Sequence, residues 1–268
     1  MKTYKQVFSE LAESKRAALI PFFVIGDPDF ETGLEIVKTA IDAGADVLEL
    51  GIPFSDPIAD GPTIQKADIR AINSGMNVAK AMEFIKKVKD YKDIPIGLLM
   101  YYNLIYQYGT EKFFSDFHQA GANSVLVADL SIDDADEITG PATSAGLDTV
   151  FMVTPNTDPE RMKLIASKTT GFIYTVSLLG VTGSREKLSD TVEGLVGKLK
   201  KLTSVPVCVG FGISKADHAA AITQAGADGV IIGSKIVQLI EENLGDRKKC
   251  LAEISTLLSE VKSAISLR

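Results

Sequence analysis

Short apolar runs alternate with longer amphipathic segments along the whole chain. The runs are rich in β-branched residues and hold no lysine or arginine, as buried strands do, whereas the segments between them repeat apolar residues near every 3.6 positions, as helices do. This alternation predicts βα units and a parallel sheet. The eight predicted strands are 18–24, 47–51, 96–100, 124–127, 149–153, 172–176, 207–210 and 229–232.

Eight βα units in 268 residues predict an α/β protein, a (β/α)8 TIM barrel that forms a single domain over residues 1–268. A doubly wound open sheet is the alternative, but Ile25-Gly26-Asp27-Pro28 after the first strand is not the glycine-rich turn of a dinucleotide-binding fold. Extra helices are expected at 3–14, over the N-terminal end of the barrel, and at 248–265. The other predicted helices are 31–43, 78–89, 111–120, 159–166, 191–202 and 215–224.

One helix-to-strand junction recurs along the chain. Ala43-Gly44-Ala45-Asp46, Ala120-Gly121-Ala122-Asn123 and Ala225-Gly226-Ala227-Asp228 each precede a predicted strand. Glycine can adopt the left-handed conformation that ends a helix, and its small neighbours let helix and strand pack closely. The repeat therefore indicates one supersecondary unit used several times.

The composition excludes several classes of function. Lys and Arg number 28 against 35 Asp and Glu, a net charge of −7 without a block of like charge, which argues against binding to nucleic acid or to an anionic membrane. No apolar run approaches the roughly 20 residues of a membrane helix. The two cysteines, Cys208 and Cys250, fit reduced thiols in a cytoplasmic protein. A small-molecule ligand is the remaining expectation.

Two carboxylates are candidates for acid–base chemistry. Glu49 lies within an apolar strand, where a charged group is costly unless it is paired or its pKa shifts. Asp60 follows on a proline-stiffened loop that is long enough to fold back over the same strand end. Since barrel enzymes act at the C-terminal ends of their strands, we expect both groups to flank one ligand. The alternatives are a carboxylate paired with a distant lysine for Glu49 and a turn-forming residue for Asp60.

Three glycine-bearing turns follow the last three strands, at 180–184, 210–214 and 233–235. A single glycine after a strand often only makes a turn. Three of them in the late loops of a barrel predict a phosphate site, because glycine lets backbone N–H groups approach an anion closely. A helix that begins at Ser234 would add the positive end of its dipole.

These motifs occur together in one known family. The run from Glu49 to Gln65, together with 97–101, 180–183, 210–214 and 233–234, resembles the tryptophan synthase alpha chain family over essentially the whole chain. The resemblance implies a carbon–carbon lyase of L-tryptophan biosynthesis. It would cleave indole-3-glycerol phosphate by a retro-aldol reaction to indole and D-glyceraldehyde 3-phosphate, with no cofactor in this chain. It also implies a beta-chain partner that carries pyridoxal phosphate, in an alpha2-beta2 heterotetramer.

The resemblance further implies roles for individual residues. Glu49 would be the acid and base, and Asp60 would accept a hydrogen bond from the indole N–H and stabilise positive charge on the ring. Thr182 would reach the Asp60 carboxylate. The residues expected around the indole are Phe22, Leu99, Leu126, Tyr174, Thr182, Phe211 and Ile231. The phosphate would be bound by Gly183, Gly212, Gly233 and Ser234, and the beta chain would be contacted by Asp56 and Pro57.

Other phosphate-binding barrels are less compatible with the sequence. A Schiff-base aldolase needs a lysine at a strand end, and none of the eight strands supplies one. A metal enzyme needs clustered ligands, but the two histidines, His118 and His218, fall within predicted helices, so no metal is expected. The rival hypotheses are another barrel isomerase or aldolase, and a catalytically weak alpha-type subunit that mainly activates a beta chain. A subunit of the second kind would have no reason to keep a costly carboxylate at Glu49.

Overall fold

The strands form one parallel sheet at the centre of the molecule. The computed structural model describes residues 1–176, 185–210 and 212–266. In the sheet the strands follow the order β5-β4-β3-β2-β1-β9-β8-β7-β6. The strands are β1 (Ala18–Val24), β2 (Leu48–Gly51), β3 (Ile96–Met100), β4 (Ser124–Val127), β5 (Asp148–Thr149), β6 (Phe151–Val153), β7 (Ile173–Val176), β8 (Val207–Gly210) and β9 (Gly229–Ile232).

The two ends of this sheet are halves of one strand. Only Val150 separates β5 from β6, and β5 pairs with β4 while β6 pairs with β7. The Val150 N–H donates to the Val125 carbonyl at 3.0 Å, so the ladder continues through the break. The sheet thus closes into a barrel built from eight runs of chain, which confirms the predicted fold.

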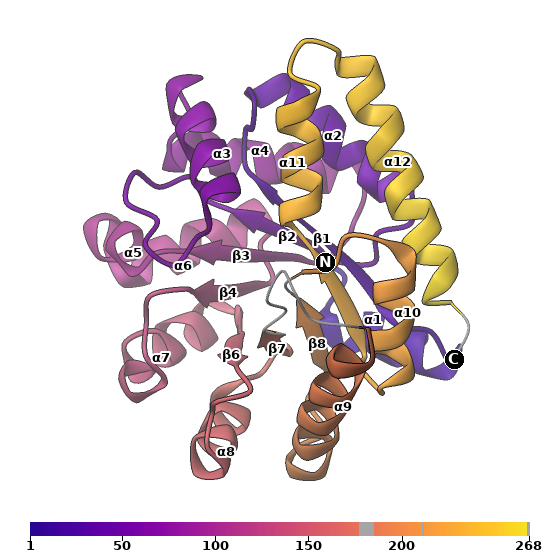
Figure 1. The fold of residues 1–268 in the computed structure, drawn as a ribbon. Helices are drawn as coiled ribbons and strands as arrows, with labels where there is room; N and C mark the ends of the chain where they lie inside the picture. The colour runs from indigo at the N-terminus through magenta and orange to yellow at the C-terminus, as the bar shows by residue number, and fades with distance from the viewer. Residues whose placement is uncertain (177–184, 211, 267–268) are drawn as a thin grey trace.

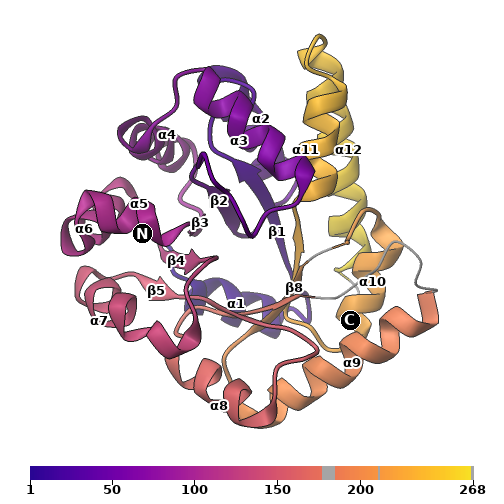
Figure 2. The same cartoon turned by 60° about the vertical axis from the view of Figure 1, so that its left-hand side comes forward.

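The helices lie in a ring around the strands (Figure 1; Figure 2). Four of them, α3, α5, η1 and α7, were not predicted; α5 and η1 are short, and Gly140 and Pro141 interrupt the helical pattern of α7. The helices are α1 (Tyr4–Glu13), α2 (Phe30–Asp42), α3 (Pro62–Asn73), α4 (Val78–Tyr91), α5 (Tyr102–Tyr108), α6 (Thr110–Ala120), η1 (Ile132–Asp134, a 3-10 helix), α7 (Asp136–Ala145), α8 (Pro159–Lys168), α9 (Arg185–Leu202), α10 (Ala216–Gln224), α11 (Ser234–Glu242) and α12 (Arg247–Ala264).

The recurring junction ends a helix and begins a strand in the same way each time. Its glycines are left-handed, with φ of 104° at Gly44, 112° at Gly121 and 96° at Gly226. Two residues later, a polar side chain accepts a hydrogen bond from a backbone N–H at the start of a neighbouring strand. The pairs are Asp46 with Leu19 at 2.8 Å, Asn123 with Ile96 at 3.0 Å and Asp228 with Val207 at 2.8 Å.

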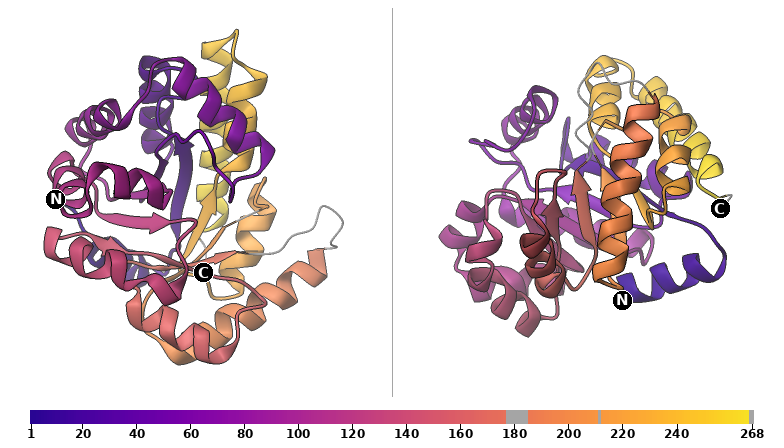
Figure 3. Two further views of the ribbon diagram at one scale, coloured as in Figure 1. Left: turned by 90° about the vertical axis from the view of Figure 1, so that its left-hand side faces the viewer. Right: turned by 60° about the horizontal axis from the view of Figure 1, so that its bottom comes forward.

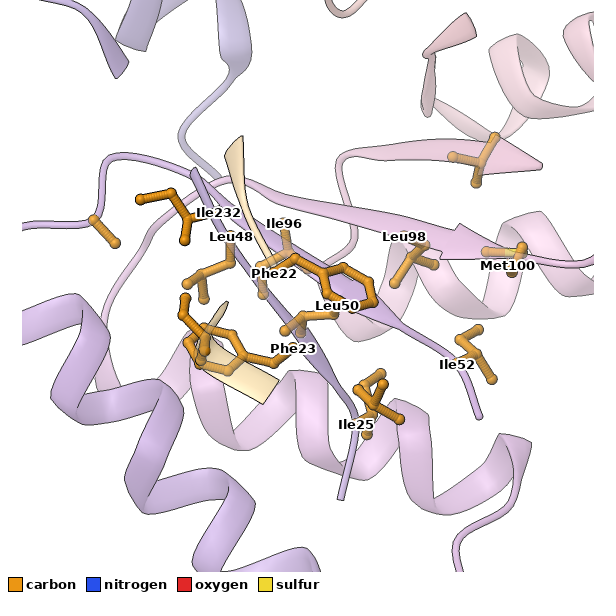
Figure 4. Packing of buried hydrophobic residues seen from close by; sticks show 14 of the residues in the cluster. Phe22, Phe23, Ile25, Leu48, Leu50, Ile52, Ile96, Leu98, Met100 and Ile232 are labelled. Atoms are coloured by element: carbon orange, nitrogen blue, oxygen red, sulfur yellow. The ribbon is translucent and has the colours of Figure 1, made fainter. Parts of the chain in front are cut away.

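The outer faces of the strands form the main hydrophobic core. Figure 4 shows part of this layer, in which Leu48 and Leu50 of β2 are paired with Ile96 and Leu98 of β3. Because successive residues of a strand point to opposite faces, burial of both leucines outside the barrel turns Glu49 toward its interior. The same alternation that stabilises β2 therefore positions a carboxylate inside the barrel.

Helix α1 fills the N-terminal end of the barrel, as predicted. Its buried side chains pack against inward-facing strand residues such as Ala18 and Cys208. The Tyr4 hydroxyl lies 2.8 Å from the Ser124 hydroxyl, and the Tyr4 ring meets the edge of Phe172 at 5.6 Å between centroids. In Figure 2, α1 lies within the ring of helices. The opposite end, at the carboxyl ends of the strands, is left for a ligand.

Helices α11 and α12 lie side by side, as the two views of Figure 3 show for the yellow segments. Helix α12 also packs against α2 and α10, so it covers the place where the first and last βα units meet. Across the described residues, no helix combines the length and the apolar character that a membrane crossing needs.

Candidate active site

A cavity of about 410 Å³ lies at the carboxyl ends of the strands. The structure brings nine of the sequence-predicted site residues into its lining, from both halves of the chain. These are Glu49, Asp60, Phe22, Leu99, Tyr174, Ile231, Gly212, Gly233 and Ser234. Segments that are far apart in sequence thus meet in one place, as the barrel topology predicts.

Glu49 is a buried carboxylate whose pKa is shifted by no cation among the described residues. It lies in β2 with a side chain directed into the barrel, and the residue is 4% exposed. Its Oε2 has no hydrogen-bond partner among the described residues. Burial, and then the negative charge of Asp60, raises the pKa of Glu49 to about 8. A carboxyl group of this kind can hold a proton at neutral pH and release it to a substrate.

Asp60 stands at the end of the loop that joins β2 to α3. The Asp60 N–H donates to the Pro57 carbonyl at 3.0 Å, and the Gln65 side-chain amide donates to the Asp60 carbonyl at 2.8 Å. Burial raises the pKa of Asp60, while a hydrogen bond of 2.6 Å donated by the Tyr101 hydroxyl to Oδ2 lowers it. This half-buried carboxylate is therefore better suited than Glu49 to stay ionised.

Aromatic and aliphatic side chains form the walls of the cavity. Phe22 and Tyr174 lie there because glycines make room for their rings. A Cβ atom at Gly51 would stand 2.9 Å from the Phe22 ring, and one at Gly233 would stand 3.1 Å from it. A side chain at Gly210 would overlap the Tyr174 hydroxyl. The cavity can consequently accept a flat apolar ring next to the two carboxylates.

The N-terminus of α11 gives the cavity an end suited to an anion. Helix α11 begins at Ser234, and its N-cap residue, Gly233, has no side chain that could cap it. Its first N–H groups and the positive end of its dipole are thus available to a bound anion. Lys235, the last residue of the predicted 233–235 turn, also lines the cavity and adds a positive charge that was not predicted from the sequence. Its position directly after Gly233-Ser234 was the available signal.

The remaining predicted residues fall outside this lining or outside the described part of the chain. Leu126 is buried in the barrel interior with the residues that contact α1, and it does not line the cavity. Asp56 is exposed on the β2–α3 loop, and Pro57 is partly exposed there. Thr182, Gly183 and Phe211 lie outside the described residues.

Two further polar residues near the site were not selected from the sequence. Tyr101 follows β3 directly and binds Asp60. Asp68 of α3 is 4% exposed, and its Oδ2 has no partner among the described residues. Burial, and then the charge of Asp60, raises the pKa of Asp68 to about 7. Its position on the apolar stripe of Ile64, Ala67 and Ala71 was a readable signal.

Potential metal ligands do not gather at this site. In the part of the chain that the structure describes, no three His, Cys, Asp or Glu side chains come together as metal ligands would. His118 lies on α6 and His218 on α10, as the sequence predicts.

Comparison with known proteins identifies the family. The family model described as tryptophan synthase alpha chain matches residues 8–266. The chain belongs to the tryptophan synthase alpha chain family. The tryptophan synthase alpha chain of Methanothermobacter thermautotrophicus is 46% identical to it over 247 residues, 92% of each chain. The tryptophan synthase alpha chain of Salmonella typhimurium is 40% identical to it over 265 residues, which cover 98% of this chain and 99% of the Salmonella chain.

A solved structure agrees with this assignment. Tryptophan synthase subunit alpha from Legionella pneumophila superposes with a TM-score of 0.91 at 31% identity, and the match covers 99% of this chain and 98% of that one. Members of the tryptophan synthase alpha chain family cleave indole-3-glycerol phosphate. This chain is accordingly a carbon–carbon lyase of tryptophan biosynthesis, which confirms the predicted function and rejects the barrel isomerase.

Proposed function

We propose that Glu49 and Asp60 cleave indole-3-glycerol phosphate within the cavity at the carboxyl ends of the strands. The observation that carries this proposal is that both carboxylates line one cavity whose lining also includes Phe22, Tyr174 and the N-terminus of α11. The aromatic walls suit the indole ring, the two carboxylates suit the reacting carbon, and the N-terminus of α11 suits the phosphate of one substrate.

Glu49 is proposed to move the protons of the reaction. Its neutral form donates a proton to carbon 3 of the indole ring, which turns the ring into a cationic indolenine. The resulting carboxylate then removes the proton of the adjacent hydroxyl, the carbon–carbon bond breaks, and its electron pair returns to the ring. Indole and the aldehyde leave, and Glu49 holds its proton again. A pKa of about 8 suits both steps near neutral pH.

Asp60 is proposed to stabilise the cationic ring. Its carboxylate accepts a hydrogen bond from the indole N–H and lies fixed where positive charge develops. A preorganised carboxylate of this kind lowers the energy of the indolenine more than that of the neutral substrate. Thr182 is predicted to contact the same carboxylate from the 180–184 turn.

The other predicted residues would bind the two ends of the substrate. Phe22, Leu99, Tyr174 and Ile231, with Phe211, are proposed to surround the indole, whereas Leu126 lies outside the cavity lining. Gly212, Gly233 and Ser234, with Gly183, are proposed to bind the phosphate through backbone N–H groups. Lys235 supports this assignment because it adds a cation to the same lining.

We further propose a cytoplasmic alpha2-beta2 heterotetramer in which a beta chain, carrying pyridoxal phosphate, receives the indole. Asp56 and Pro57 would contact that partner. Their loop supports the idea, because the next residue, Ile58, is 82% exposed although it is apolar. A tryptophan synthase from M. tuberculosis, 29% identical to this chain with a TM-score of 0.88, is among the similar solved structures.

Indole release by the purified chain tests the proposal. We expect slow release from indole-3-glycerol phosphate by the chain alone and faster release with a beta chain. Glu49→Gln should lower kcat by at least about 100-fold, because proton transfer is lost, and should leave the calorimetric Kd for substrate within about threefold. Glu111→Gln, on the exposed surface of α6, is the matched control and should behave as the wild type.

Two results would contradict these assignments. Retained turnover in Glu49→Gln would remove Glu49 from proton transfer. Activation of a beta chain without indole release under any condition would favour the activator subunit instead.

A further inference from the structure

Tyr101 lies next to the site without lining its cavity. It is the residue that follows Met100, the end of β3, and it is 2% exposed. The described lining of the cavity includes Leu99 but not Tyr101. Tyr101 can therefore affect a ligand in the cavity only through the residues that it contacts.

The Tyr101 hydroxyl binds the β2–α3 loop twice. It accepts a hydrogen bond from the Ala59 N–H at 3.1 Å and donates one to Asp60 Oδ2 at 2.6 Å. Ala59 and Asp60 are consecutive and belong to the loop, whereas Tyr101 belongs to a different βα unit. One hydroxyl thus fixes both the backbone and the side chain of the loop at the point where it enters the cavity.

The Tyr101 ring holds the other end of the same loop. Its centroid lies 5.1 Å from that of Phe54, with 25° between the ring planes, which is a stacked arrangement. Phe54 follows β2 by three residues and Asp60 precedes α3 by two, so Tyr101 contacts the loop near both of its ends. A loop rich in turns is in this way tied to a strand of the barrel.

We propose that Tyr101 is the positioning residue of Asp60. It occupies Oδ2 and thereby fixes the rotation of the carboxylate, which leaves Oδ1 for the indole N–H. The inference rests on the proposed function, since it assigns Tyr101 a role only through Asp60. Precise placement of a charged group by its neighbours is what such a site requires.

The hydroxyl also acts on the charge of Asp60. Burial raises the pKa of Asp60, and the Tyr101 hydrogen bond lowers it. The other ionisable groups that face Asp60 from the described elements are Glu49 on β2, Asp68 on α3 and Tyr174 on β7. Lys235 of α11 lines the same cavity. Loss of the hydroxyl removes a contact that favours the carboxylate, and ionised Asp60 then requires a higher pH.

Tyr101→Phe tests the proposal because it deletes the hydroxyl and keeps the ring on Phe54. With indole-3-glycerol phosphate as substrate, we expect kcat to fall about 10- to 100-fold while KM changes less than about threefold, because the transition-state contact is misplaced and the phosphate site is intact. The acidic limb of the kcat profile should move to higher pH. Thermal unfolding of the variant shows the fraction that is folded.

Tyr102→Phe is the matched control. It deletes the neighbouring hydroxyl, which donates to Glu137 at 3.3 Å, and should retain the wild-type kcat and pH profile. Both changes in Tyr101→Phe are required, so a fall in kcat with an unmoved limb, or a moved limb with unchanged kcat, overturns the proposal. Failure of the proposed function is distinct, since it appears as retained turnover in Glu49→Gln.

Discussion

Burying a charged carboxylate costs folding free energy, so the presence of Glu49 in a buried strand points to a functional role. Glu49 interrupts an otherwise apolar strand, and the described part of the molecule provides no cation beside it. Its charged form is penalised by burial, so the folded protein holds the proton up to about pH 8. A residue that only maintained the fold would be more favourable as leucine. The same energetic penalty that weakens the fold is the property that the proposed proton transfer uses.

Stability measured against pH checks this reasoning. The raised pKa of Glu49 means that the folded state binds its proton more tightly than the unfolded state. Its contribution is therefore present at low pH and is lost as the pH rises toward 8. Position 49 does not titrate in Glu49→Gln, so the unfolding free energy of this variant relative to the wild type should increase by about 3 kcal/mol between about pH 6 and about pH 9. Chemical denaturation at each pH measures the unfolding free energies of the variant and the wild type. A difference between them that does not change with pH would contradict the raised pKa of Glu49.

At the scale of elements, the start of α11 links a local sequence pattern to a function. Gly233 leaves the helix uncapped and Ser234 is its first residue, so the free N–H groups and the dipole face the cavity. Ordinary capping residues would satisfy those N–H groups within the protein. These N–H groups are the ones to which the proposed phosphate would bind.

Ser234→Asp separates the stability of α11 from its binding function. The added carboxylate interacts favourably with the helix dipole, so Tm should stay the same or rise. It also repels the phosphate, so KM for indole-3-glycerol phosphate should rise at least about tenfold. Steady-state kinetics and calorimetric unfolding measure the two effects. Ser234→Ala keeps the backbone N–H groups and should keep KM within about threefold; an unchanged KM in Ser234→Asp would place the phosphate elsewhere.

At the scale of the whole molecule, stability and chemistry occupy opposite ends of the barrel. The recurring junctions, α1 and the Tyr4–Ser124 contact lie at the N-terminal end, whereas Glu49 and Asp60 line the cavity at the other. Substitutions at the two ends should accordingly change different quantities.

Asp46 provides a test of that separation. Asp46 Oδ2 accepts from the Leu19 N–H at 2.8 Å and from the Lys262 ammonium of α12 at 2.5 Å. Asp46→Ala leaves both groups unpaired and should lower the unfolding free energy by about 1–3 kcal/mol, with kcat unchanged below the unfolding transition. Asp46→Asn keeps an acceptor for the Leu19 N–H and should lower the unfolding free energy by less than Asp46→Ala does. A lower kcat at full folding would show that the two ends are coupled.

The strands and the main carboxylates were predictable from sequence for physical reasons. The strands 18–24, 96–100, 124–127, 207–210 and 229–232 match the structure residue for residue, because burial on both faces leaves an uninterrupted apolar run. Glu49 and Asp60 were expected together because strand ends converge in a barrel. Tyr101 was missed because its role depends on a contact with a residue 41 positions away. Leu126 was placed in the cavity by resemblance, whereas the structure buries it with the α1 contacts.

The closure of the barrel has a consequence for synthesis on the ribosome. β1 is made first, yet one of its two neighbours is β9, which is made last. The nascent chain therefore carries an unsatisfied strand edge until residues 229–232 have emerged, and such an edge is a template for association with other chains. Translation through residue 232 must therefore precede the pairing that protects β1.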